Sequence, residues 1–185
     1  MTILPSQQGC SVAELRLHGF QNTPNNVIMR LKERLAAGLH AFFAPISVEP
    51  LPLPVPTKAY ERTRDQYRAA PFLAALQARA PSGVHGLALV NLDLFVPQLN
   101  FIFGVAQPDG HALVALPRLS PVFYGLTENP TLYLQRVHKE AVHELGHVLG
   151  LDHCTNYCVM RFSNTLADTD EKPDAYCPQC KGQLD

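Results

Sequence analysis

The chain has 185 residues, of which 46% are hydrophobic and 17% are charged, and its formal net charge is −1. This length suits one domain with a real core, and the composition argues against a disordered chain. Because lysine and arginine are scattered, the sequence lacks the basic stripe of a nucleic-acid-binding protein, and we expect no nucleic-acid partner.

The N-terminal residues show no basic segment followed by an apolar run, so they do not resemble a secretory signal. No apolar stretch approaches the roughly 18 residues that cross a bilayer. We therefore expect a cytoplasmic monomer with no membrane partner. In a reducing compartment, closely spaced cysteines are more typical of metal sites than of disulfides.

The apolar pattern of the first half predicts strands and helices in alternation. Residues 12–17 alternate as in a strand, and Asn25 and Asn26 can cap a helix that runs to about Phe43. The remaining predictions in this half are a strand at 46–48, a polyproline-like crossing loop at 50–56, a helix at 71–79 and a strand at 84–90.

A hairpin and a long helix are predicted next. Residues 100–104 and 111–116 are apolar runs, and the segment 107–110 between them has the proline and glycine positions of a type I turn. One helix then runs from about Thr131 to Leu149, and Gly150 stands where a helix ends in the left-handed conformation. Beyond it the chain is polar and cysteine-rich, so metal must replace hydrophobic core there.

The long helix carries the motif that predicts function. His143 and His147 are four residues apart, so they share a helix face and can bind one ion. A turn at Gly150 can bring His153 round as a third ligand, which leaves the fourth position of a catalytic zinc for water. Glu144 can accept the proton of that water as general base. The motif predicts hydrolysis of a carbonyl bond, most naturally an amide.

Four cysteines predict a second metal site. Cys154 and Cys158 form one pair and Cys177 and Cys180 another, and four thiolates close a tetrahedral structural zinc without room for water. Two disulfides are the alternative. Because His153 and Cys154 are consecutive, one strap can serve both metals. Cys10 is interpreted as a free thiol, with a self-inhibiting thiolate at the open zinc position as the alternative.

Two further polar residues receive structural interpretations. His138 lies five residues before His143, off the face of the metal ligands, and is expected to be exposed to solvent. Asp93 is interpreted as a turn-forming residue, with the orientation of a zinc-bound histidine as the alternative.

The histidine motif, followed by Met160 in the position of a methionine turn, is that of the metzincins. Together with the four cysteines it resembles the archaemetzincins, and further similar segments lie at 64–67, 92–97, 99–104 and 161–164. One departure is that three residues separate Cys154 from Cys158, whereas the family pattern has four.

The resemblance implies an α+β, zincin-like fold: a twisted mixed sheet, two main helices over the active-site cleft and an irregular, zinc-stabilised C-terminal subdomain. It implies the same roles for the three histidines, Glu144 and the four cysteines, and two zinc ions per chain. Residues 101–104 would form the edge strand that pairs with an extended peptide. The single domain 1–185 would comprise an upper subdomain, 1–150, and a lower one, 151–185.

Three functions remain open from the sequence. The first is a zinc metallopeptidase that acts on peptides or proteins. The second is a catalytically silent zinc-binding module that binds extended peptides along the edge strand. A zinc-ribbon nucleic-acid module built on the cysteines alone is disfavoured by the net charge and by the three-histidine motif.

Overall fold

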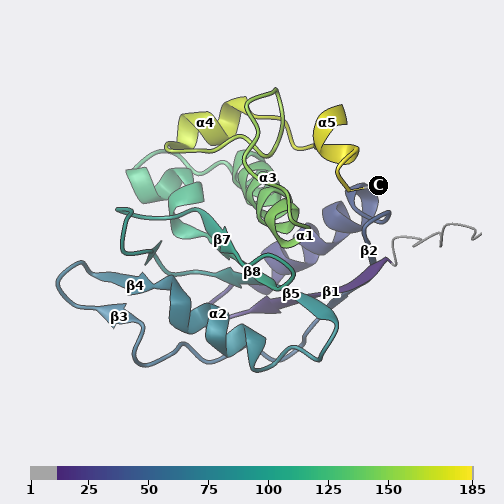
Figure 1. Ribbon diagram of the computed structural model, residues 1–185. Coiled ribbons are helices and arrows are strands. Elements are labelled where there is room, and N and C mark those ends of the chain that lie inside the picture. The colour runs from purple at the N-terminus through teal and green to yellow at the C-terminus, as the bar shows by residue number, and fades with distance from the viewer. Residues whose placement is uncertain (1–11, 185) are drawn as a thin grey trace, which may run out of the picture.

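A mixed five-stranded sheet forms the centre of the protein, of which the computed structural model describes residues 12–184 (Figure 1). The strand order is β2-β1-β5-β8-β7. Four strands are parallel, and the edge strand β7 runs antiparallel to β8. The strands are β1 (Ala13–Gly19), β2 (Phe43–Val48), β5 (Val84–Val90), β7 (Gly104–Ala106) and β8 (His111–Ala115). Cys10 lies outside the described residues.

Helices cover both faces of this sheet. Strand residues alternate between the faces, so Leu87 and Leu89 join the core under α1 (Asn25–Gly38) and α3 (Pro130–Val148), whereas Ala88 and Val90 face α2 (Ala69–Gln77). The α2 side also carries a small sheet of β3 (Tyr60–Glu61), β4 (Gln66–Arg68) and β6 (Leu94–Phe95). The mixed sheet with two main helices on one face is the predicted α+β arrangement.

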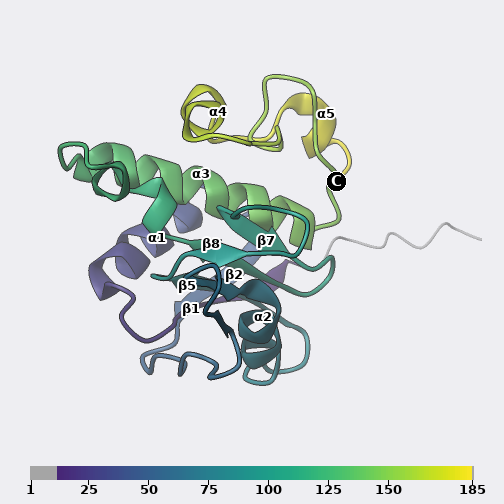
Figure 2. The ribbon, with the colours of Figure 1, turned by 90° about the vertical axis from the view of Figure 1, so that its left-hand side faces the viewer.

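The C-terminal segment 151–184 lies across α3 from the sheet (Figure 2). It contains two short helices, α4 (Leu166–Glu171) and α5 (Pro178–Lys181). Ion pairs join it to α3: Arg136 binds Asp170 through two hydrogen bonds of 2.7 and 2.6 Å, and the fully buried Lys172 lies 2.9 Å from Glu140. Arg136 and Glu140 lie on the same side of α3 as His143 and His147. This part of the helix therefore packs against the C-terminal segment and not against water.

Four predicted details are wrong. The first helix, α1, ends at Gly38, a weak helix former, and Phe43 begins β2. Asn25 and Asn26 are the first helical residues of α1 and do not cap it. The first hairpin strand is Gly104–Ala106, not 100–104. The turn joins Gly110 N–H to Gln107 O at 3.0 Å, but the φ of 54° at Asp109 is typical of type II and excludes type I.

The predicted exposure of His138 is also wrong. Its side chain is buried, its ring nitrogens have no hydrogen-bond partner within 12–184, and burial lowers its pKa. Asp174 of the C-terminal segment lies 3.9 Å from its Nδ1. The expectation failed because only the face of the metal ligands was considered: His138 stands three, four and seven residues before the core residues Ala141, Val142 and Leu145 and shares their side of α3.

No helix among residues 12–184 combines the length and the apolar character needed to span a bilayer.

Candidate active site

The long helix α3 presents the first two histidines of the motif. Asn129 caps it by accepting a 3.0 Å hydrogen bond from Leu132 N–H, and Pro130 occupies the first helical position. At the other end Gly150 has a φ of 87°, the predicted left-handed conformation. The chain therefore turns back immediately after the helix, and this turn carries His153 to the helix face that bears His143 and His147.

The three imidazoles converge. The ring centroids of His153 lie 4.8 Å from those of His147 and 5.4 Å from those of His143, and the Nε2 atoms of His143 and His147 are 3.2 Å apart. Two nitrogens that bind one tetrahedral zinc at its usual bond length lie about 3.3 Å apart. The spacing of the histidines therefore fits a metal ion held between them.

The opposite ring nitrogens are held by backbone carbonyls. His143 Nδ1 lies 2.8 Å from Val159 O, and His147 Nδ1 lies 2.7 Å from Leu151 O. Each carbonyl can only accept, so both Nδ1 atoms carry the proton and both Nε2 lone pairs are free for a metal. Burial also lowers the pKa of His143 far below its ordinary value and that of His153 to a lesser degree. Neutral imidazole is the form that binds metal.

Glu144 is buried beside the first ligand. Burial raises the pKa of its carboxyl well above the usual value, with the nearby Glu140 adding to the shift. Gly104 of the edge strand lies directly against it: a Cβ atom at this glycine would stand only 2.5 Å from Glu144 Oε1 and 2.6 Å from its Cγ. The absence of a side chain at position 104 is therefore what allows Glu144 to occupy this place.

A cleft of about 460 Å³ runs past the histidines. Its upper rim is the segment 99–106, which includes β7, and its opposite rim is the segment 162–164. The predicted edge strand exists, but it begins at Gly104; residues 101–103 precede it as irregular chain. The ring of Phe162 lies 5.0 Å from that of His153, so the lower rim touches the third histidine.

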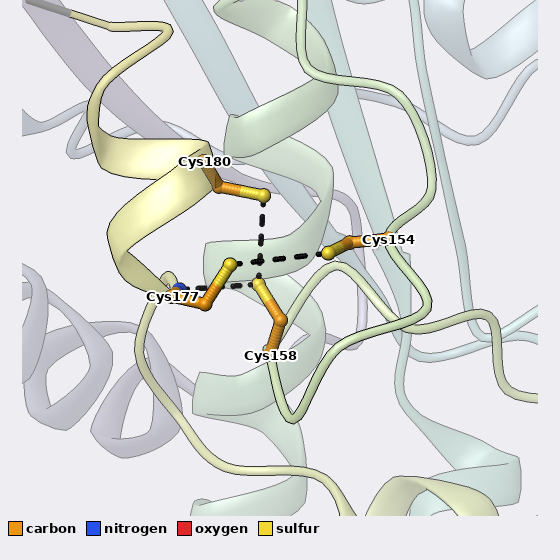
Figure 3. Close-up of side chains that lie close together, drawn as sticks. All are labelled: Cys154, Cys158, Cys177 and Cys180. Carbon is orange, nitrogen blue, oxygen red and sulfur yellow. Dashed lines mark hydrogen bonds between the residues drawn. The ribbon is translucent and has the colours of Figure 1, made fainter.

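The four cysteines point toward one another (Figure 3). Cys154 Sγ lies 3.9 Å from Cys177 Sγ, and Cys158 Sγ lies 3.7 Å from Cys180 Sγ. A disulfide requires about 2.05 Å, whereas four thiolates around a tetrahedral zinc stand about 3.8 Å apart. The sulfur atoms thus have the spacing of a metal site, and the loop with one residue fewer between Cys154 and Cys158 still brings both to it.

The chain that carries these two clusters is similar to the proteins of a known family. The model of peptidase family M54 matches residues 78–185. An archaemetzincin of Pyrococcus furiosus is 41% identical over 167 residues, which cover 88% of this chain and 87% of the relative. The chain belongs to peptidase family M54, the archaemetzincins. It is thus a member of a zinc metallopeptidase family, as its motif predicts.

Solved archaemetzincin structures confirm the fold. The crystal structure from Methanopyrus kandleri matches with a TM-score of 0.80 at 34% identity and covers 98% of this chain and 97% of that one. The Archaeoglobus fulgidus archaemetzincin complexed with malonate matches with a TM-score of 0.78 at 33% identity, over 92% of this chain and 99% of that one. A zinc-dependent peptidase of Methanocorpusculum labreanum matches with a TM-score of 0.81 at 27% identity, over 92% and 100% of the two chains.

Met160, which stands in the position of the methionine turn, is a packing residue. It is fully buried, and a Cβ atom at Gly146, between the two helical histidines, would overlap its sulfur. Asp93, in contrast, takes neither of its predicted roles: it lies outside any turn and accepts two 2.7 Å hydrogen bonds from Arg118.

Several residues around the site were missed from the sequence. The carbonyls of Val159 and Leu151 hold the histidines, but a backbone acceptor leaves no trace in residue identity. Gly104 and Gly146 are required by close approach, and an isolated glycine is too common a signal to reveal such a contact.

Proposed function

We propose that His143, His147 and His153 hold a catalytic zinc and that Glu144 is the general base in hydrolysis of peptide bonds. In this proposal Cys154, Cys158, Cys177 and Cys180 hold a second, structural zinc. Residues 1–150 and 151–185 act as the upper and lower subdomains of one metalloprotease domain, with the cleft between them. The observation that carries the proposal is the convergence of three imidazoles beside one buried carboxyl.

The ligand sets favour different roles for the two metals. Three imidazoles leave one tetrahedral position open, and they border the cleft, so a substrate can reach it. Four thiolates leave no position open, and three of the four cysteines are buried. The histidine site is therefore suited to catalysis and the cysteine site to stabilising the C-terminal segment, which has little regular structure of its own.

The three histidines would hold a zinc ion, which would supply Lewis-acid chemistry toward water and the carbonyl of the scissile bond. Glu144 would accept the proton that the attacking water gives up and return it to the leaving amine. The side chain has no hydrogen bond within 12–184 that would compete for these protons. Its burial against Gly104 holds the carboxyl beside the first histidine, so it needs little reorganisation.

The substrate we propose is an extended peptide. Strand β7 pairs with β8 on one side, and within 12–184 no strand pairs with its other side, which borders the cleft. An extended peptide can add to such an edge through its own backbone hydrogen bonds. The scissile bond of that peptide would then lie beside the three histidines and Glu144.

Metal counting and turnover test the proposal together. We expect two zinc atoms per chain by elemental analysis and cleavage within a broad peptide library. Removing one zinc with a chelator should abolish cleavage, and one equivalent of zinc should restore it. A protein that holds both zinc atoms and leaves the whole library intact would instead favour the silent module that binds extended peptides.

Gly104→Ala should lower kcat/KM for a cleaved peptide by about tenfold or more, because the new methyl group displaces Glu144 while leaving the metal ligands in place. Zinc content should stay at the wild-type value. The matched control is Gly38→Ala, since a Cβ atom there meets nothing within 4 Å. Equal activity of the two variants would show that Glu144 tolerates the displacement and would argue against its role as base.

A further inference from the structure

The upper rim of the cleft is held by side chains from a distant part of the chain. Residues 99–103 line the cleft but form no strand. Two of their carbonyls are bound by β4 and the turn before it: Arg64 donates to Leu99 O at 3.2 Å and to Asn100 O at 2.7 Å, and Gln66 Nε2 donates to Asn100 O at 2.9 Å. The rim thus depends on contacts that span more than thirty residues.

Gln66 is the centre of this network. Its side chain is buried, and both polar atoms of its amide are used. Oε1 accepts a 2.9 Å hydrogen bond from Arg64 Nε, and Nε2 donates to Asp93 Oδ2 at 2.9 Å as well as to the rim carbonyl of Asn100. A side chain without the amide donor cannot satisfy both acceptors, so the network specifies glutamine at this position.

Asp93 extends the network to the aromatic wall of the cleft. Its two carboxylate oxygens each accept a 2.7 Å hydrogen bond from Arg118, in the bidentate geometry that fixes a guanidinium in orientation. The same guanidinium lies 4.4 Å from the ring centroid of Phe101 on the rim and 4.9 Å from that of Phe123. The ion pair of Asp93 with Arg118 therefore fixes the orientation of the guanidinium plane against which Phe101 packs.

The network ends beside the catalytic carboxyl. The ring of Phe101 packs edge-on against Phe103 at 5.2 Å, and Phe103 is buried in the core between the sheet and α3. Gly104, the next residue, begins β7 and touches Glu144. A shift of the rim would move both the strand edge and the wall that a bound peptide meets.

We infer that Gln66, Asp93 and Arg118 are positioning residues for substrate binding: together they hold residues 99–103 so that β7 and Phe101 receive one side of an extended peptide. This inference rests on the proposed function. It also accounts for the segments 64–67, 92–97 and 99–104, which resemble the family but carry no metal ligand: each supplies one part of the network.

The test uses two variants and a matched control in the full-length, zinc-loaded protein. Gln66→Glu keeps the shape and the acceptor for Arg64 but removes the donor and faces Asp93 with a like charge. Arg118→Lys keeps the charge and loses the bidentate contact. The control, Glu61→Gln, changes the residue paired with Gln66 across β3 and β4 and breaks the ion pair of Glu61 with Arg68. Among residues 12–184 the Glu61 side chain bonds only Thr63 and Arg68 and none of the rim carbonyls.

Binding of three zinc-chelating probes is measured by calorimetry: acetohydroxamate, a tripeptide with a C-terminal hydroxamate and a succinyl hydroxamate that carries a tripeptide on its other side. We expect each variant to bind one of the two peptide probes, the one whose peptide lies over Phe101, about tenfold more weakly than wild type does. Affinity for the other peptide probe and for acetohydroxamate should stay at the wild-type value. Equal loss for both peptide probes, or for neither, would overturn the inference.

Hydrogen exchange supplies a readout that needs no metal. The Ile102 amide donates to Leu94 O at 3.0 Å, and we expect its exchange to become faster in both variants but not in Glu61→Gln. Unchanged exchange would show that the network does not hold the rim. Failure of wild type to bind acetohydroxamate would contradict the proposed function itself, and exchange at Ile102 would still decide whether these residues position the rim.

Discussion

Glu144→Ala should lower kcat/KM for a cleaved peptide by roughly 10³-fold while zinc content stays at the wild-type value. Glu144 touches none of the backbone carbonyls that hold the histidines, so the metal ligands should keep their positions. The carboxyl is buried against the edge strand at Gly104. Glu140 also lines the cleft, but it is paired with Lys172 at 2.9 Å. Loss of Glu144 therefore leaves only this paired carboxyl among the residues that line the cleft.

The measurement is steady-state cleavage of a peptide selected from a library on wild type, paired with elemental analysis of the same samples. Glu33→Ala, which removes an exposed glutamate of α1, is the control and should match wild type. Cleavage that survives in Glu144→Ala would refute its role as general base. Loss of zinc together with activity would show that Glu144 supports the metal and would leave its chemical role without support.

Cys180→Ser should weaken both metal sites, although the cysteine binds only one of them in our proposal. The carbonyl of Val159, the residue after Cys158, accepts a hydrogen bond from His143 Nδ1. Cys154, the residue after His153, donates its N–H to Met160 O at 3.0 Å. If the cysteine site opens, this loop loses its anchor and both histidines lose their support. Changes to groups that hold a ligand in this way cost about 10–100-fold in metal affinity.

Zinc per chain is measured after equilibration with chelators of graded strength. We expect Cys180→Ser to lose one zinc outright and to release the second at a chelator strength that wild type withstands. Tyr157→Ala is the control, because Tyr157 is 72% exposed in the same loop and should leave both sites unchanged. A Cys180→Ser protein that retains one zinc as tightly as wild type would show that the two sites are independent.

Elements with long or regular patterns were predicted well. The strand at 84–90 and the long helix from about residue 131 match β5 and α3 closely, since their apolar residues repeat over two or more turns or pleats. The small sheet was missed because β3, β4 and β6 have only two or three residues each, too few to show a period. Side-chain contacts such as those of Gln66 hold these strands in place.

The end of α1 and the burial of His138 were predicted wrongly for different reasons. Apolar residues continue past Gly38 with helical spacing, but Phe43 is taken up by pairing in β2. His138 stands three, four and seven residues before Ala141, Val142 and Leu145, so it shares a helix face with core residues, and this local pattern already favours burial. A partner remote in sequence therefore explains the end of α1, whereas the burial of His138 follows from its own helix face.

The candidate metal ligands could be identified from the sequence alone. Their spacing is short, and a rigid helix followed by a glycine turn leaves few ways to arrange His143, His147 and His153. Tertiary structure decided what surrounds them: Gly104 against Glu144, the Val159 carbonyl on His143, and the rim held by Gln66 and Asp93. These contacts join segments that lie far apart in the chain, and only packing of the whole core determines which of them meet.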